Sequence, residues 1–209
     1  MSAADIELWF YARPDRALSI NQRHAEIIDR MSRIDAPLGF AGLELPAAPS
    51  CGDGLVATYT VKFPIRGLRC VGDYAYRGDR YIYEDRASYD EHLRFGFKAS
   101  NKAIDYRLIV NVYLPRLIEA FKGYRAHVSY DLYSLYYQGG LSDNNATYNR
   151  LREDKTLDVD GRNNIYTLHP AQFWDADLCQ SALGYGPDEV IARLEGKCRM
   201  AVPLMGGSI

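Results

Sequence analysis

An acidic pattern in the second half of the chain has the form of a metal-dependent nuclease motif. Asp143 is followed by a Glu-x-Lys tripeptide made of Glu153 and Lys155. In such nucleases carboxylates hold magnesium and a lysine helps to activate water. A second Glu-x-Lys tripeptide occurs at residues 195–197, and neither lies on an obvious strand hairpin, so the pattern arises easily in a charged chain. A nuclease that uses Asp143, Glu153 and Lys155 is therefore the alternative function.

Tyrosines alternate with acidic residues just beyond position 72. In a hairpin alternate residues share one face, so Tyr74 and Tyr76, or Tyr81 and Tyr83, could form a paired aromatic surface with a carboxylate rim. Rigid aromatic side chains lose little entropy on binding, and an acidic rim speeds the encounter with a basic partner. The other interpretation is that these tyrosines cover a helix or a sheet edge. The candidate partner-binding residues are Asp73, Tyr74, Tyr76, Asp79, Tyr81, Tyr83, Glu84 and Asp85.

The other residue types form no recognised catalytic or metal-binding pattern. The sequence lacks the glycine-rich nucleotide loops, the GxSxG motif of hydrolases and the HExxH motif of zinc proteases. Its four histidines stand at the ends of unrelated predicted elements, and its four cysteines form no CxxC pair. We therefore predict no catalytic residues, no metal site, no cofactor and buried free thiols.

Composition excludes several classes of protein. The chain has 209 residues, of which 47% are hydrophobic and 25% charged, as in an ordinary globular domain. Its 25 Lys and Arg against 27 Asp and Glu give a net charge of −2, without the positive field that general nucleic-acid binding needs. No stretch has the length and apolarity of a membrane span, and Asp5 and Glu7 stand where a signal sequence would be basic and then apolar. We expect a cytoplasmic protein with no membrane and no direct nucleic-acid partner.

The first half of the chain shows strand and helix periodicity in turn. Ser19 and Gln22 have the form of a capping box, which opens a helical pattern. Ser88 and Glu91 form a similar pair ahead of three apolar residues, and Pro115 interrupts a later helical pattern, which favours two helices in tandem. The predicted elements are strands over 5–11, 55–63 and around 74–83, a loop over 42–54, and helices over 20–34, from 88 through 97, and from 104 to 123.

The second half is expected to contain fewer strands and a long polar loop. Pro170 and Pro187 each have the position of a helix start, and Gly184 follows the first of these helices where a C-terminal glycine is expected. The predicted elements are strands over 127–138, 165–168 and 198–204, a loop over 142–164, and helices over 170–183 and from 187. Because strands and helices are mixed without βαβ alternation, we predict an α+β fold with a largely antiparallel sheet and several helices. One domain over 1–209 is expected, with two subdomains that meet near residue 50 or 140 as the alternative.

The C-terminal part of the chain resembles the bacterial immunity protein 52 family. The similarity begins at residues 168–179 (LHPAQFWDADLC) and continues through Leu183 and Gly184 to residues 187–196 (PDEVIARLEG). Members of that family bind and neutralise polymorphic toxins, often type VI secretion effectors with a restriction-endonuclease-like nuclease domain. The resemblance implies a binding role and identifies no residue that contacts the toxin.

We therefore expect an immunity protein, not an enzyme, whose partner is a cognate toxin. It would cover the active site or substrate groove of a nuclease effector with the stretch 73–85 and the polar loop 142–164. A structural or scaffold subunit that neither binds a toxin nor catalyses a reaction is a third hypothesis.

Overall fold

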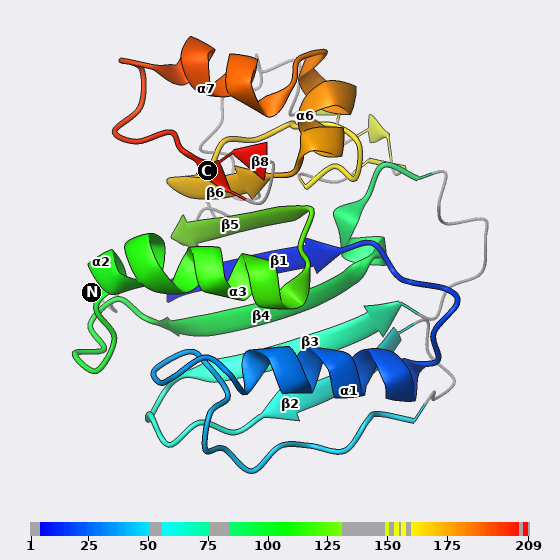
Figure 1. Cartoon of the computed structure of the whole chain (residues 1–209), viewed down its shortest axis with the longest axis vertical. Helices are drawn as coiled ribbons and strands as arrows, with labels where there is room; N and C mark the ends of the chain where they lie inside the picture. The colour runs from blue at the N-terminus through cyan, green and yellow to red at the C-terminus, as the bar shows by residue number, and fades with distance from the viewer. Residues whose placement is uncertain are drawn as a thin grey trace.

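One antiparallel sheet runs through the part of the chain that the computed structural model describes, namely residues 5–50, 56–75, 84–130, 149–150, 153–154, 156–157, 160–204 and 207–208 (Figure 1). The strand order is β2-β3-β4-β1-β5-β6-β8-β7, and neighbouring strands pair antiparallel. The strands are β1 (Asp5–Ala12), β2 (Val56–Val61), β3 (Arg69–Ala75), β4 (Glu91–Lys98), β5 (Arg125–Tyr130), β6 (Ala171–Trp174), β7 (Pro203–Leu204) and β8 (Gly207–Ser208). The predicted α+β class with a largely antiparallel sheet is confirmed.

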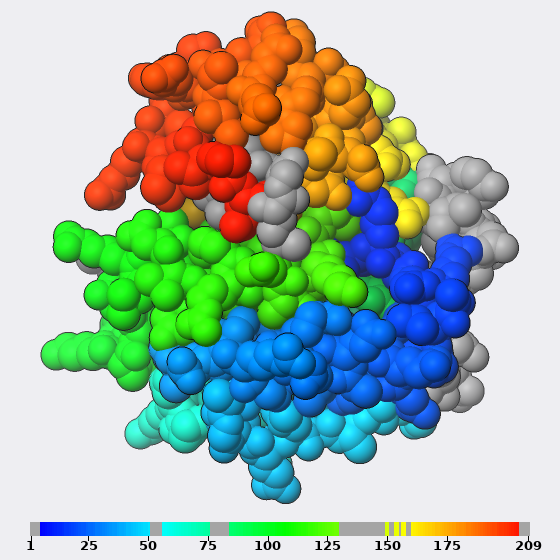
Figure 2. Space-filling model, in the orientation of Figure 1, coloured from blue at the N-terminus to red at the C-terminus, as the bar shows by residue number. Residues whose placement is uncertain are grey.

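Helices cover one face of this sheet and one of its ends. They are α1 (Ile20–Met31), α2 (Tyr106–Leu108), α3 (Leu114–Phe121), α6 (Ala176–Leu183) and α7 (Pro187–Leu194). Figures 1 and 2 show α1 and α3 side by side in front of the strands, where their atoms close this face of the sheet. The α6 and α7 helices contact each other and lie at the β6 end. None of the described helices has the length and apolarity needed to cross a bilayer.

The two sides of β1 belong to two different hydrophobic clusters. Alternate residues point to opposite faces of a strand, so Phe10 faces the helical layer and joins Met31 of α1 and Phe121 of α3 in the larger cluster. Its neighbour Tyr11 joins a smaller cluster with Trp174 of β6 and residues of α6 and α7. At Phe10 and Tyr11 the central strand is therefore covered on both sides.

The sequence prediction of a helix from Ser88 through Phe97 is wrong. Residues 91–98 form β4, which pairs with β1 on one side and with β3 on the other. Leu93, Phe95 and Phe97 are spaced by two, so a strand places all three against the helical layer, whereas a helix would spread them around its axis. Of the predicted capping residues, Ser88 lies within a short 3₁₀ turn, Ala87–Tyr89, and Glu91 is the first residue of β4.

The helices around Pro115 follow the sequence prediction. The α2 and α3 helices stand in tandem, joined by a π-helical turn over Ile109–Tyr113. Pro115 lies in the first turn of α3, where its missing N–H costs no intrahelical hydrogen bond. The capping box at the start of α1 is also confirmed, because the Ser19 hydroxyl accepts from the backbone of Gln22 and the Gln22 side chain accepts from the backbone of Ser19.

The C-terminal prediction is right about two helices and wrong about where the first begins. Asp175 caps α6 by accepting from the backbone N–H of Leu178 at 2.7 Å, so the residues after Pro170 form the strand β6 and not helix. No strand forms at the described residues 165–168. Gly184 closes α6 with φ 76°, as expected, and α7 begins at Pro187.

Three predicted strands differ from the structure in their bounds. β3 occupies 69–75, β5 occupies 125–130, and the last strands are two residues long. The remaining parts of the predicted strands at 76–83 and 131–138 lie outside the described residues, as does most of the predicted loop over 142–164.

Two strand glycines offer a test of this packing. Gly72 of β3 faces Tyr59 across the β2–β3 pair, and a β-carbon at Gly72 would overlap the Tyr59 ring. Gly72→Ala should lower the free energy of unfolding by about 1–3 kcal/mol, because the buried ring has to move. The measurement is urea-induced unfolding followed by circular dichroism. Gly96→Ala is the matched control, since a β-carbon there would lie 3.4 Å from the movable guanidinium end of Arg69. Equal losses for both variants would contradict this packing.

Candidate functional site

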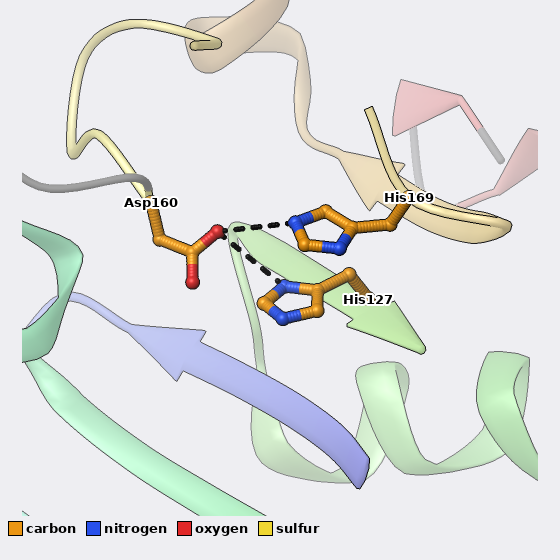
Figure 3. A group of neighbouring side chains, drawn as sticks. All are labelled: His127, Asp160 and His169. Atoms are coloured by element: carbon orange, nitrogen blue, oxygen red, sulfur yellow. Dashed lines mark ion pairs between the residues drawn. The ribbon is translucent and has the colours of Figure 1, made fainter. Parts of the chain in front are cut away.

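A group of buried polar side chains lies on the sheet face that is turned away from α1 and α3. Arg125 and His127 alternate along β5 with apolar residues of the core, so both project to this face. The segment that begins at Asp160 and ends at His169 lies against them, and Figure 3 shows its two side chains beside the His127 ring. We call Asp160, His127, His169, Arg125 and Tyr11 the Asp160 cluster.

The Asp160 carboxylate is the centre of this cluster. Its Oδ2 accepts a hydrogen bond from the Tyr11 hydroxyl at 2.9 Å. Its Oδ1 lies 3.3 Å from Nη2 of Arg125, 3.4 Å from Nε2 of His169 and 3.7 Å from Nδ1 of His127. The two imidazole rings stack, with centroids 3.8 Å apart and planes within 11° of parallel.

Arg125 ties the same segment to the sheet through its backbone. The guanidinium is 1% exposed, and its Nη1 donates to the carbonyl oxygens of Gly161 at 2.9 Å and Asn164 at 3.1 Å. The backbone carbonyl of Asp160 in turn accepts from the N–H of Ala87 at 2.8 Å. A single buried arginine therefore hydrogen-bonds two backbone carbonyls and lies within ion-pair distance of the Asp160 carboxylate.

The charges of the cluster favour one protonation state. Burial alone raises the pKa of Asp160, but His127, His169 and Arg125 outweigh it and hold that pKa well below the usual range. Burial lowers the pKa of His127 to about 3, because the attraction of Asp160 offsets only part of the cost of desolvating an imidazolium. At neutral pH the cluster thus holds an ionised Asp160, a charged Arg125 and a neutral His127.

Two further carboxylates fasten residues 160–166 to the segment before β4. Asp90 is buried, accepts from the Tyr124 hydroxyl at 2.9 Å and pairs with Nε of Arg162 at 3.0 Å. Asp85 accepts from the backbone N–H of Asn163 at 2.6 Å, from the amide of Asn164 at 2.7 Å and from the Tyr166 hydroxyl. Both contacts join residues far apart in the chain.

The Asp160 cluster contains the residue types of a metal site but not its geometry. One atom each from His127, Asp160 and His169 lie within 4.8 Å of one another, and separations of 3.4 and 3.7 Å suit ligands that share a tetrahedral ion. A metal, however, lies near the plane of each imidazole that binds it, and two rings stacked face to face cannot share one such ion. The Arg125 guanidinium beside the same carboxylate oxygen also repels a cation. These residues fit a salt-bridge network and not a metal centre.

Burial also argues against direct catalysis by these histidines. A carboxylate that orients an imidazole is the arrangement of a general base, but the imidazole then has to reach a substrate. His127 is 3% exposed, and the His169 side chain is 7% exposed. What the arrangement does is anchor the chain segment from Asp160 to His169 onto the sheet.

Part of the predicted partner-binding stretch is placed by the structure. Tyr74 is 1% exposed, hydrogen-bonds Nδ1 of His24 at 2.9 Å and stacks on Tyr59, so it does not present its ring to a partner, contrary to the prediction. Asp73 lies on the opposite face, 2.7 Å from Nε2 of His92. Glu84 is partly exposed.

The rest of the predicted site residues are separated or undescribed. Asp85 binds residues 163–166, as given above. Tyr76, Asp79, Tyr81 and Tyr83 lie outside the described residues.

The structure describes only one of the three residues of the alternative nuclease motif. Glu153 is exposed, and Asp143 and Lys155 lie outside the described residues. The second tripeptide, at residues 195–197, follows the end of α7 and is exposed.

The cysteines follow the prediction only in part. Cys70 and Cys179 are buried free thiols, as expected, whereas Cys198 is free but exposed. Cys51 lies outside the described residues.

A second candidate surface was not predicted from the sequence. We define the open sheet face as the side of β2, β3, β4 and β1 that points away from α1 and α3. Trp9 and Arg94 are cross-strand partners there, and the guanidinium lies 4.9 Å from the centre of the indole ring. The sequence analysis places Arg94 in a predicted helix, so it gives no indication of this pair. The described side chains of the open sheet face used below are Glu7, Trp9, Thr58, Thr60, Arg69, Val71, Asp73, His92 and Arg94.

Replacing Asp160 tests the anchoring role. Asp160→Asn keeps the acceptor for Tyr11 but leaves the buried Arg125 without its counter-charge, so the free energy of unfolding should fall by about 3–5 kcal/mol in urea titrations. Asp29→Asn is the control, since it removes a carboxylate from an exposed pair with Arg33 and should change stability by less than about 0.5 kcal/mol. A loss below about 1 kcal/mol for Asp160→Asn would show that the segment is held by other contacts.

The lowered pKa of His127 predicts a pH dependence. The unfolded chain takes up a proton on this histidine near pH 6.5, whereas the folded protein takes it up only near pH 3. Between these values the unfolded state binds more protons, so the histidine destabilises the folded protein as the pH falls, by about 1.4 kcal/mol per pH unit. Glu91, whose pKa burial raises to about 7, acts in the opposite direction.

A variant separates the two groups. The stability of wild type relative to His127→Gln, from urea unfolding at several pH values, should fall by about 1.4 kcal/mol for each unit between pH 6 and pH 4, because Glu91 contributes equally to both. Parallel pH profiles of the two proteins would rule out a neutral, desolvated His127.

Comparison with known proteins gives no family for this chain. It matches no protein-family model, no curated protein and no solved structure. The resemblance described for residues 168–196 thus rests on those residues alone, which form β6, α6 and α7.

Proposed function

We propose that this protein binds a protein toxin and neutralises it, and that the open sheet face is its binding surface. The observation that carries the proposal is the Trp9–Arg94 pair, which joins β1 and β4 at the side of that face next to β5. Tryptophan and arginine are the residue types most enriched where truncation weakens protein complexes most. Their pairing on a partly exposed strand surface therefore favours a docking role.

Trp9 is held in place before any partner arrives. Its indole N–H donates to Glu7 at 3.1 Å, and its ring lies 6.0 Å from the Tyr11 ring with planes 14° apart. Arg94 rests on the ring, and Tyr11 is itself fixed by Asp160. A side chain that is already ordered loses little conformational entropy on binding, which raises affinity.

The surroundings of this pair suit a flat protein surface. Thr58 and Thr60 of β2 and Arg69 of β3 are exposed, and Val71 of β3 pairs directly with Arg94. Four strands of about six residues cover an area of about 20 by 15 Å, or about 300 Å². Each partner buries roughly 800 Å² in a standard complex, so this area alone is too small. Residues around the face must supply the remainder, and the stretch 76–85 follows directly on β3 in the sequence.

The role of the complex follows from the resemblance of residues 168–196 to an immunity family. We propose that the partner is a nuclease effector and that binding covers its active site or substrate groove. Such an immunity protein acts in the cytoplasm of the cell that it protects. The alternative, a nuclease that uses Asp143, Glu153 and Lys155, gains no supporting observation from the described residues.

Calorimetric titration tests this proposal, with the catalytic domain of the toxin-like protein encoded beside this chain as the partner. The nuclease activity of that domain is followed in the same titration. Wild type should bind with fixed stoichiometry and abolish activity, and Trp9→Ala should weaken binding by about thirtyfold or more. Leu108→Ala is the control, because Leu108 is a large apolar residue of the helical layer that is 48% exposed.

Two outcomes would contradict the proposal in different ways. Absence of binding by wild type at micromolar concentration would remove the toxin-binding function. Inhibition that survives both Trp9→Ala and Arg94→Ala would place the interface on another surface. A cleavage assay of the chain itself with magnesium or manganese, and with Glu153→Ala, tests the alternative in the same preparation.

A further inference from the structure

We propose that the open sheet face receives carboxylates of its partner, in particular the acidic side chains that hold the metal ion in a nuclease active site. This inference rests on the proposed function and adds the chemistry of the contact. It starts from the charges of the described side chains on that face. Asp73 is paired with His92 at 2.7 Å, and Glu7 accepts from the Trp9 indole at 3.1 Å.

The basic groups of the face are not neutralised in the same way. No described ion pair includes Arg69 or Arg94 within the part of the chain that the structure places. Arg94 contacts the Trp9 ring, and Arg69 is exposed beside Gly96. The two carboxylates are thus held by hydrogen bonds within the face, whereas the guanidinium of Arg69 is exposed and that of Arg94 is partly exposed.

The two arginines stand close enough to bind a single acidic cluster. Arg69 is paired with Gly96, which lies two residues beyond Arg94 on the same face of β4. Because Gly96 has no side chain, the Arg69 guanidinium can lie over it, at 3.4 Å from the position that a β-carbon would take. Residues two positions apart on a strand, such as Arg94 and Gly96, have Cα atoms about 7 Å apart. At such a spacing two guanidinium groups can each bind a carboxylate of one acidic site.

This arrangement complements the active site of a metal-dependent nuclease. Such sites gather carboxylates that repel one another unless cations lie between them. Guanidinium groups are planar, permanently charged and suited to two-pronged contacts with carboxylates. Arginines in that position would take the place of the metal ions and of the substrate phosphate groups at once.

A nucleic acid is the competing occupant, since phosphates also bind arginine. Single-stranded nucleic acids need aromatic faces on which bases stack. The guanidinium of Arg94 already covers the ring of Trp9, and the β2 side chains of this face are threonines. These observations favour an acidic protein surface.

Charge reversal tests the inference against a matched control. Arg69→Glu and Arg94→Glu should each weaken binding to the toxin catalytic domain by about a hundredfold, measured by calorimetry at low salt. Arg107→Glu makes the same charge change at an exposed position of α2 and should weaken binding by less than about threefold. Replacing an active-site carboxylate of the toxin by its amide should weaken binding to wild type but add little to the effect of Arg69→Glu.

The outcomes separate this inference from the proposed function. If the toxin binds wild type, Arg69→Glu and Arg94→Glu equally well, the proposed function stands and the inference is wrong. If wild type binds no toxin, the proposed function fails, and the face is then probed directly by nuclear magnetic resonance.

That second measurement uses acetylated hexaglutamate, hexalysine and a thymidine oligonucleotide as probes. Hexaglutamate should shift the indole N–H resonance of Trp9 in wild type and not in Arg69→Glu, while hexalysine leaves it unchanged. No shift with hexaglutamate, or a shift with the oligonucleotide alone, would overturn the inference. Since Arg69 is exposed, its replacement tests the contact even where Arg94→Glu fails to fold.

Discussion

The buried ion pair between Arg125 and Asp160 is the interaction on which the second face of the sheet depends. An unpaired arginine in such a place would be strongly destabilising, so the chain segment that supplies Asp160 has to lie against β5. The same carboxylate accepts from Tyr11 and thereby fixes the side chain that stands next to Trp9 in the central strand. The cluster thus couples the position of one loop to the order of the strand beneath it.

This coupling divides the second face into two parts. At the β5 and β6 end, Asp160 and Asp90 are buried and pair with Arg125 and Arg162. Over β2 and β3, Thr58, Thr60 and Arg69 are exposed, and Arg94 of β4 rests on Trp9 and is partly exposed. The enclosed part gives rigidity, and the more exposed part is where we propose that a partner binds. A rigid platform beside an accessible surface is what a binding protein needs, because order that exists before binding does not have to be created by it.

The sequence predicted the elements whose signals are local. The capping pair Ser19 and Gln22, the glycine at 184 and the prolines at 115 and 187 each act within one turn of chain, and the structure has them as expected. It failed at β4, because Ser88 and Glu91 mimic a helix start while the strand is determined by pairing with two distant strands.

The candidate sites escaped prediction for the same reason. His127, Asp160 and His169 have no fixed spacing, and only the long-range pairing of β5 with β1 and β6 brings them together. The one signal available was the unusual placement of Arg125 and His127 at alternate positions of an otherwise apolar strand. The pair of Trp9 and Arg94 likewise depends on the register between β1 and β4. The two residues are far apart in the sequence, so no local sequence pattern indicates that they meet. The prediction that Tyr74 lies on the surface failed because strand alternation shows which residues share a face but not which face is covered.

The central position of β1 has a consequence for the order in which the protein forms. This strand precedes both of its neighbours in the sequence, because β4 and β5 begin at residues 91 and 125. Tyr11 of this strand can form its hydrogen bond only after Asp160, 149 residues later in the chain, has been made. Contacts between distant parts of a chain close slowly, because the entropy of the intervening loop is lost before the contact forms. The strand 5–12 therefore stays without its partners until β4 and β5 have been made, and its acidic residues Asp5 and Glu7 help to keep it from pairing with other chains in the meantime.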